Sequence, residues 1–228
     1  MKIVVTDLTR FSNPDLVCLA GIDIETGRCI RPLPYLPMQS IIEHNIIPSD
    51  ILESNFITLN SGQPHTEDCN YGNISKLGIA TPYDFEAILS RDLSTSISHG
   101  FNYNFAEKKI PIEFAPNKSI ITIKLNTSQI EVVEDTYNPS KIRLSLIDSD
   151  GKRFNYLSIT DLGFHSYFLQ NTNNPNFINH INNFIRSYQD VYLRVGLARE
   201  HEGAYWLQIN GIYLFSTYRI NHIFRDKV

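Results

Sequence analysis

The sequence predicts a mainly β protein with a few helices, a β-rich α+β fold arranged as two small antiparallel β-barrels. Three β-hairpin patterns lie along the chain, at residues 16–33, 142–157 and 191–215. Apolar and polar residues alternate most clearly in the last of them, which indicates strands that bury one face. The chain shows no strand–helix–strand alternation of the kind that builds a parallel sheet. Two β-sandwiches or one larger barrel are the alternative architectures.

The predicted elements of the first part of the chain follow its apolar runs and its turn residues. In chain order they are strands Lys2–Asp7, Leu16–Ile24, Arg28–Leu33 and Ile51–Leu59, a long polar loop over 61–73, and a short helix Pro82–Arg91. The loop of the first hairpin, 25–27, ends in glycine, which suits a type I turn followed by a left-handed residue. That loop length places Gly21 opposite Arg31 and Ile22 opposite Ile30.

Residues 100–118 contain two prolines and no clear period, so we expect a domain boundary within them. The expected domains are residues 1–115 and 116–228, each the size of one small barrel. The second domain is predicted to contain strands Ser119–Leu125, Ile142–Asp148, Arg153–Leu157, Val191–Ala198 and Tyr205–Phe215, and helices Asp161–Leu169 and Asn176–Tyr188.

The two hairpins of the second part each have a predicted register. A loop at 149–151 places Leu144 opposite Tyr156 and Leu146 opposite Phe154, which gives one apolar face. In the last hairpin a slip by one residue would mix the apolar and polar faces, so the pattern favours a single register. Its facing pairs are Leu197–Leu207, Val195–Ile209, Ala198–Trp206, Gly196–Gln208 and Arg194–Asn210.

The charge balance limits the classes of function. The chain has 20 Lys and Arg residues against 24 Asp and Glu residues, a formal net charge of −4. This balance excludes binding to polyanions through the overall field of the protein, so a nucleic-acid function requires a local positive face.

Cysteines and apolar runs indicate where the protein works. No apolar run is long enough to span a membrane and no secretory signal opens the chain, so we expect a cytoplasmic protein with no membrane partner. Cys18, Cys29 and Cys69 are odd in number and lack metal-ligand spacing. We expect them to be reduced, small core residues, and we expect neither a metal nor a cofactor.

Four stretches of the sequence resemble one known family. They are Val5-Thr6-Asp7-Leu8-Thr9-Arg10; Val17 to Asp23 with Gly27-Arg28 and Ile30-Arg31-Pro32; Pro64-His65-Thr66-Glu67-Asp68; and Tyr192 to Arg199 with Trp206 and Asn210-Gly211-Ile212-Tyr213. On these residues the chain resembles the dual OB domain-containing proteins of bacteria. The resemblance implies two oligonucleotide- and oligosaccharide-binding (OB) folds in one unit. OB folds commonly bind single-stranded nucleic acid or oligosaccharide.

The candidate binding residues are arginines, aromatic residues and one amide in or near these stretches: Arg10, Arg28, Arg31, Tyr35, Arg194, Arg199, Trp206 and Gln208. Arginine binds phosphate with two parallel hydrogen bonds, and aromatic rings stack on bases. The combination is therefore typical of a groove for single-stranded nucleic acid. Each main candidate also has a structural alternative. Arg31 would instead pair with Asp7 or Asp23, and Trp206 would instead cover a gap in the core.

His65, Glu67 and Asp68 cluster in the predicted polar loop. Such a trio can bind a metal or act as acid and base. Its spacing matches no zinc pattern, and the alternative is that the acids cap the backbone or that Asp68 pairs with one of the arginines. The sequence contains no G-x-S-x-G, P-loop or G-x-G-x-x-G motif.

Three functional hypotheses follow. The leading one is a non-enzymatic module in which OB-like barrels hold single-stranded DNA or RNA on an arginine and aromatic face. The second is an accessory subunit that docks a protein partner, such as a nuclease, a helicase or a defence effector. The third is a metal-dependent hydrolase that uses His65, Glu67 and Asp68.

Overall fold

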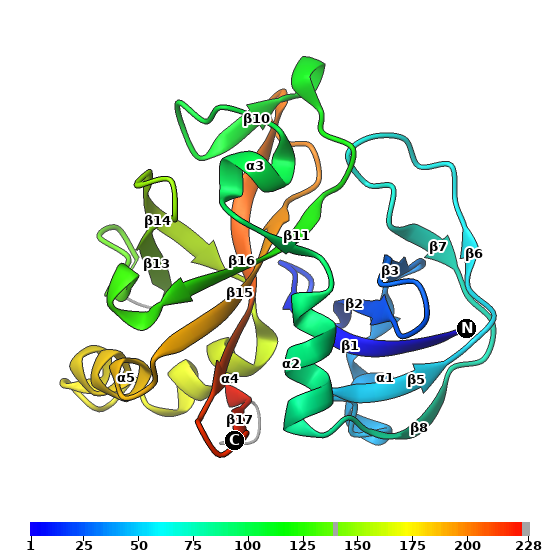
Figure 1. Cartoon of the computed structure of the whole chain (residues 1–228), viewed down its shortest axis with the longest axis horizontal. Coiled ribbons are helices and arrows are strands. Elements are labelled where there is room, and N and C mark those ends of the chain that lie inside the picture. Colours follow the sequence, from blue (N-terminus) through cyan, green and yellow to red (C-terminus); the bar gives the residue numbers. More distant parts are fainter. Residues whose placement is uncertain (139–140, 225–228) are drawn as a thin grey trace.

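The structure is a computed structural model that describes residues 1–138 and 141–224. Its strands form two mixed β-sheets, which make up two lobes that lie side by side (Figure 1). The helices are α1 (Met38–Glu43), α2 (Pro82–Ser90), α3 (Ile97–Phe101), α4 (Leu162–Gln170) and α5 (Phe177–Arg186), with 3₁₀ turns at Ile112–Phe114 and Thr127–Gln129. Within the described ranges, no helix has the length and apolarity needed to cross a membrane.

The first sheet is made of the N-terminal strands. They are β1 (Lys2–Arg10), β2 (Leu16–Asp23), β3 (Cys29–Pro32), β4 (Leu36–Pro37), β5 (Asp50–Glu53), β6 (Ile57–Thr58), β7 (Asp68–Asn70) and β8 (Ser75–Ile79). Their order across the sheet is β6-β7-β3-β2-β1-β5-β8, and β4 pairs with β2.

The second sheet is made of the remaining strands. They are β9 (Leu93–Ser94), β10 (Lys109–Pro111), β11 (Ile120–Asn126), β12 (Ile130–Glu134), β13 (Ile142–Ile147), β14 (Arg153–Ile159), β15 (Asp190–Leu197), β16 (Ala204–Phe215) and β17 (Asn221–His222). Their order is β12-β13-β14-β16-β15-β11-β9, and β10 and β17 both pair with β16.

The expectation of two antiparallel barrels needs correction. The pairs β3–β7, β9–β11 and β14–β16 are parallel, and neither sheet closes into a barrel within the part of the chain that the structure describes. One cause is the predicted loop 61–73, which returns as β7 and sets Asp68 opposite Arg31. The polar composition of this segment led to the prediction of a loop. In the structure its Asp68 side chain is buried and bonds to Arg199, which follows β15 of the second sheet, rather than to water.

The two sheets divide earlier than residue 115. Strand β9 pairs with β11, and β10 pairs with β16, so residues 93–111 contribute to the second sheet. Helix α2 lies between the last strand of the first sheet, β8, and β9. Sheet membership therefore changes at α2, ahead of the expected boundary between residues 115 and 116.

The predicted register of the first hairpin is wrong by one residue. Gly21 lies opposite Ile30, and Ile22 lies opposite Cys29. The reason is a four-residue loop, 24–27, closed by hydrogen bonds from Asp23 N to Arg28 O and from Gly27 N to Asp23 O (2.9 Å each). The Asp23 carboxylate also accepts hydrogen bonds from the backbone N–H groups of Glu25 and Thr26, which stabilises the longer loop.

β-Bulges alter the other two registers. In β13–β14, Leu146 lies opposite Phe154 as predicted, but Leu144 faces Leu157 instead of Tyr156. The extra residue lies on β14, where Tyr156 has a positive φ of 56° and donates its N–H to Ser145 Oγ (3.2 Å).

In β15–β16 the predicted pairs Leu197–Leu207, Val195–Ile209 and Gly196–Gln208 are confirmed. Beyond them Arg194 faces Gly211, not Asn210. Asn210 is the extra residue of a bulge, and its amide packs against Gly196, where a Cβ atom would clash. A glycine is required at this position because the Asn210 side chain occupies the space.

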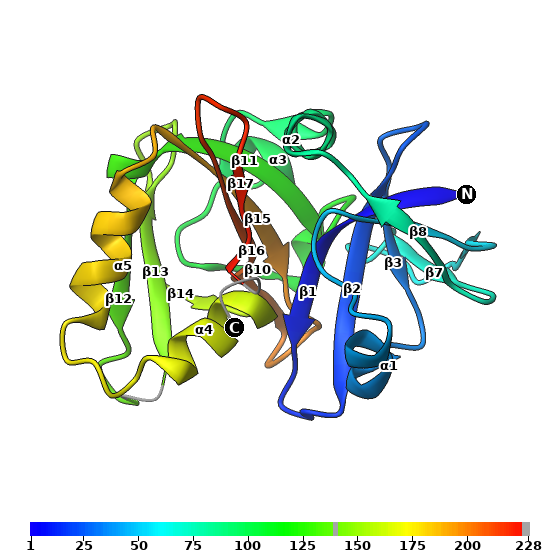
Figure 2. The ribbon, with the colours of Figure 1, turned by 90° about the horizontal axis from the view of Figure 1, so that it is seen from below.

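Helix α2 joins the hydrophobic interiors of the two lobes. Its N-cap Thr81 accepts a hydrogen bond from Asp84 N, and proline occupies the first turn. Phe85 and Leu89 are fully buried in a cluster with residues of both sheets, including Tyr192 and Tyr213. Figures 1 and 2 show α2 at the junction of the lobes, where β1 and β16 also meet.

Candidate nucleic-acid interface

A buried polar network connects the two sheets. Arg194 on β15 has no exposed surface, and its Nε donates to Asp7 Oδ2 on β1 (2.9 Å). Its Nη1 donates to Thr122 Oγ1 (2.8 Å), and its Nη2 contacts Cys29 Sγ (3.4 Å). A buried ion pair of this kind leaves an uncompensated charge if one partner is removed. Arg194 and Asp7 therefore depend on each other across the two sheets.

A second part of the network centres on Asp68. Arg31 Nε donates to Asp68 Oδ1 (2.6 Å), and the guanidinium of Arg199 holds both carboxylate oxygens (2.9 and 3.1 Å). Burial opposes ionisation of Asp68, but the two arginines outweigh it and lower the pKa of the carboxyl. Arg199 also donates to Tyr35 Oη (2.8 Å) and lies over that ring. Asp68 thus links the first sheet to the end of β15.

Glu67 and His65 lie in the same region. The Glu67 carboxylate accepts hydrogen bonds from Ser119 N (2.6 Å), Ile120 N (3.2 Å) and Ser119 Oγ (3.0 Å) across the interface. His65 is buried edge-on against Tyr205. Burial, reinforced by nearby arginines, lowers the pKa of His65 to about 3, so the ring is neutral at physiological pH.

The network changes how four sequence candidates are interpreted. Arg31 and Arg194 are only 4% and 0% exposed, and both guanidinium groups are engaged by carboxylates. Arg31 is paired with Asp68 and not with Asp7 or Asp23. The expected pairing of Asp68 with one of the arginines is confirmed, and it involves both Arg31 and Arg199. The oxygens of Glu67 and Asp68 serve as hydrogen-bond acceptors between the sheets. The described residues contain no group of three or more His, Cys, Asp or Glu side chains arranged to hold a metal.

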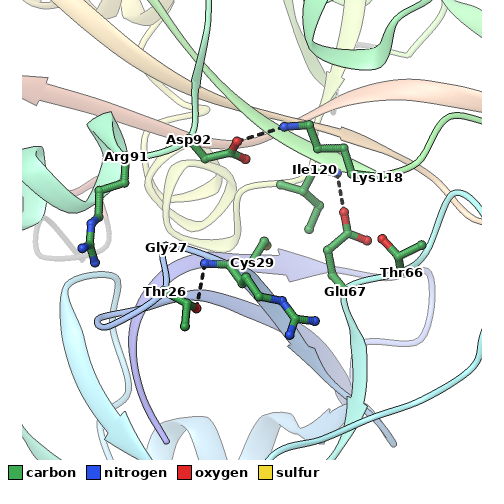
Figure 3. A pocket seen from close by; sticks show the side chains of 10 residues that line it. Thr26, Gly27, Cys29, Thr66, Glu67, Arg91, Asp92, Lys118 and Ile120 are labelled. Atoms are coloured by element: carbon green, nitrogen blue, oxygen red, sulfur yellow. Dashed lines mark hydrogen bonds and ion pairs between the residues drawn. The ribbon is translucent and has the colours of Figure 1, made fainter.

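A cavity of about 440 Å³, the inter-sheet pocket, opens beside this network (Figure 3). The β2–β3 loop with Thr26 and Gly27 lies along one side of it, and Asp92 and Lys118 lie opposite. Arg28, a sequence candidate, is an exposed residue of this pocket. Its side chain is thus accessible to a ligand, unlike those of the buried Arg31 and Arg194, which were predicted to share a binding face with it.

A larger groove of about 590 Å³, the Trp206 groove, lies on the second sheet. It is lined by side chains that include Lys108, Asp135, Tyr137, Arg143, Tyr156 and Trp206. Trp206 and Gln208 share the outer face of β16 because side chains alternate along a strand. Ser158 pairs with Gln208 and Arg143 with Ser158, so polar residues extend across three strands.

The aromatic rings of the groove are accessible. Trp206 is half-buried, whereas Tyr137 and Tyr156 are 96% and 48% exposed. The Lys109 ammonium lies 5.0 Å from the centroid of the Trp206 ring, a cation–π contact. The interpretation of Trp206 as a fully buried core residue does not fit this exposure. Rings in such a position can stack on flat ligands.

Positive charge exceeds negative charge at the groove. Arg143 Nε donates to Asp135 Oδ2 (2.7 Å), and this is the one carboxylate lining the described groove. Burial and the neighbouring Arg143 lower the pKa of both Lys108 and Arg10. Arg143 thus repels both Lys108 and Arg10, an arrangement that a bound anion would relieve.

Arg10 extends the groove towards the first sheet. Its N–H donates to Thr160 O (3.0 Å), just after Ser158 on β14, and its Nε is buried without a hydrogen-bond partner in the described structure. The next residue, Phe11, packs against Tyr35 with ring centroids 4.4 Å apart. Through Tyr35 the surface continues to Arg199, whose side chain is 41% exposed.

The sequence candidates therefore fall into three groups. Trp206 lines the Trp206 groove, Gln208 and Arg10 lie beside it, and Tyr35 and Arg199 continue the surface from Arg10. Arg31 and Arg194 are buried between the sheets, and Arg28 lines the inter-sheet pocket.

Sequence reasoning missed several groove residues, above all Lys108, Arg143 and Tyr156. Arg143 had a usable signal, because its neighbours Leu144 and Leu146 were predicted on the apolar face of that strand and so placed Arg143 on the outer face. Lys108 had none, since its position depends on β10 crossing to β16.

Comparison with known proteins supports the resemblance seen in the sequence. The family model described as the dual OB-containing domain matches residues 1–212. A search of the curated proteins gives no match. A search of the solved structures gives none either. The residues of the inter-sheet network and of the Trp206 groove all lie within the matched range, and the chain belongs to the dual OB-containing domain family.

Proposed function

We propose that the protein is a non-enzymatic module that binds single-stranded nucleic acid, DNA or RNA, in the Trp206 groove. The observation that carries the proposal is the convergence of accessible aromatic rings and unbalanced positive charge in one groove. A family of OB-containing domains fits this role, because OB folds commonly bind single strands.

The groove residues divide the binding between bases and backbone. A base stacked on Trp206, with Tyr156 or Tyr137 beside it, contributes about 1–3 kcal/mol whatever its identity. Lys108, Arg143 and Arg10 lie where they can neutralise backbone phosphates. Gln208 is held by Asn210 Oδ1 through its Nε2 (3.0 Å), which leaves its amide oxygen as an acceptor for a base or sugar. The proposal includes no sequence-specific readout.

Trp206 provides a direct test, because it is the sole tryptophan of the chain. Titration with short single-stranded DNA or RNA at low salt should quench its fluorescence as bases stack on the ring. A labelled oligonucleotide followed by anisotropy measures the same binding in variants that lack the tryptophan. We expect Trp206→Ala to weaken binding by about 5- to 150-fold, the equivalent of one stacked base.

Charge and control variants sharpen this test. Lys108→Ala and Arg143→Ala should each weaken binding, whereas Lys2→Ala removes an exposed lysine outside both cavities and should not. Circular dichroism and a thermal melt establish that each variant is folded. Absence of binding at low salt would overturn the proposal and leave the docking of a protein effector as the alternative. Equal affinity of wild type and Trp206→Ala would show that the strand lies elsewhere.

A further inference from the structure

The inter-sheet pocket has the features of a second ligand site, distinct from the Trp206 groove. Figure 3 shows Arg91 on one side of the cavity, Asp92 and Lys118 above it, and Glu67 on the other side. A volume of about 440 Å³ is far larger than a single phosphate requires and lies in the range of small-molecule sites. Trp206 does not line this cavity.

Two guanidinium groups of the pocket have no carboxylate partner within the described residues. The Arg28 side chain makes no hydrogen bond or ion pair there. Arg91 donates only to backbone carbonyl oxygens, those of Ile24 and Glu25. Both charges therefore remain unneutralised beside the cavity, in a protein whose net charge is −4.

The acidic groups of the pocket are already engaged. Asp92 is paired with Lys118 (Nζ to Oδ1, 2.9 Å). The Glu67 carboxylate accepts the N–H groups of Ser119 and Ile120 and lies 3.9 Å from Arg31 Nη2. The charge left over at the rim is positive. Guanidinium groups present forked donors that match phosphate oxygens, and two of them favour a ligand with more than one phosphate.

We infer that the inter-sheet pocket binds a small polyphosphate, free or as part of a nucleotide, through Arg28, Arg91 and Lys118. Arg28 immediately precedes β3 of the first sheet, whereas Lys118 lies just before Ser119 and β11 of the second sheet. A ligand bound by Arg28 and Lys118 would connect the two lobes beside the buried polar network that includes Glu67. Binding should therefore also resist separation of the two sheets.

Isothermal titration calorimetry of the full chain with inorganic triphosphate, at low ionic strength, tests this site. Parallel titrations use ATP and sodium sulfate of equal ionic strength. We expect saturable binding of triphosphate or ATP, no comparable binding of sulfate, and a rise in melting temperature with ligand concentration. Preference for ATP would assign the site to nucleotides, and equal affinity would assign it to the polyphosphate itself.

The variants separate this site from the groove. Arg28→Ala changes an exposed side chain and should fold, and it should weaken binding by about tenfold or more, as should Arg91→Ala. Lys2→Ala and Trp206→Ala should bind triphosphate as the wild type does. Absence of binding to triphosphate and ATP, or equal binding by Arg28→Ala and Lys2→Ala, would overturn the inference. Loss of oligonucleotide binding in Arg28→Ala without any binding of triphosphate would also overturn it, because the pocket would then belong to the nucleic-acid path.

Discussion

At the scale of single residues, the same side-chain type serves opposite purposes in this protein. Arg194 and Arg31 are buried between the sheets and paired with Asp7 and Asp68, whereas Arg10 at the accessible groove has no carboxylate partner among the described residues. The difference is whether a carboxylate is paired with the guanidinium group. An arginine whose charge is matched stabilises the fold, and one whose charge is unmatched is available to a ligand.

Truncation of Arg194 should be strongly destabilising. Arg194→Ala leaves Asp7 buried and unpaired, so the free energy of unfolding should fall by about 3–5 kcal/mol in urea titrations. Replacing both partners, as in Asp7→Leu with Arg194→Met, should recover much of that loss. Arg186→Ala, at a partly exposed pair with Glu131, is the control and should cost less than about 1 kcal/mol. A loss that small for Arg194→Ala would contradict the role assigned to the pair.

His65 should make the protein sensitive to acid. The pKa of its buried ring is lowered to about 3, while an unfolded histidine has a pKa near 6.5. Between these values the unfolded state binds the extra proton, so stability falls as the pH is lowered from about 6.5 towards 3. His65→Phe keeps an aromatic ring against Tyr205 and removes this term. From pH 7 to pH 5 the wild type should lose about 2 kcal/mol more than His65→Phe.

Urea unfolding of both proteins at several pH values measures that difference. Parallel profiles for the wild type and His65→Phe would mean that His65 is accessible to protons in the folded state.

At the scale of elements, two β-bulges shape the strands around the Trp206 groove. The bulge on β14 sets Tyr156 at a positive φ and the bulge on β16 folds Asn210 over Gly196. Both change the register that simple alternation predicts, and both lie next to the Trp206 groove. Bulges redirect side chains out of the regular pattern, and a non-glycine residue with positive φ is destabilising, so it persists only where the surrounding structure holds it.

Tyr156 allows binding to be separated from folding. Tyr156→Asn places a residue that tolerates positive φ at this position. Its free energy of unfolding should therefore stay within about 1 kcal/mol of the wild-type value, while its affinity for the oligonucleotide falls. Tyr156→Val, a β-branched residue, should lose about 1–2 kcal/mol or more of stability at this φ. Unchanged anisotropy binding in a folded Tyr156→Asn protein would exclude this ring from the interface.

At the scale of the whole molecule, a net charge of −4 is compatible with a local positive groove. The cations at issue gather on one face of the second sheet and in the inter-sheet pocket, while several acids are buried in pairs. Screening by salt limits the range of each charge to about 10 Å, so the groove and not the total charge governs a bound strand.

The salt dependence of binding should therefore be shallow. With three phosphates neutralised, the slope of log K against log salt for a single strand should be about −2. Lys108→Ala should make the slope shallower by about 0.7, and Lys2→Ala should leave it unchanged. Anisotropy titrations at several salt concentrations give both slopes. A much steeper slope would mean that phosphate contacts extend well beyond the groove.

The family, the abundance of β-structure, most strand positions and the register around Gly196 can be predicted from the amino-acid sequence. These follow from local alternation, turn residues and short motifs, which depend only on neighbours along the chain. Which arginines are buried, where β7 and β10 pair, and which side chains meet Trp206 are known from the folded structure alone. The reason is that burial and charge pairing arise between segments far apart in the sequence, as between Asp7 and Arg194, and local patterns carry no information about those distances.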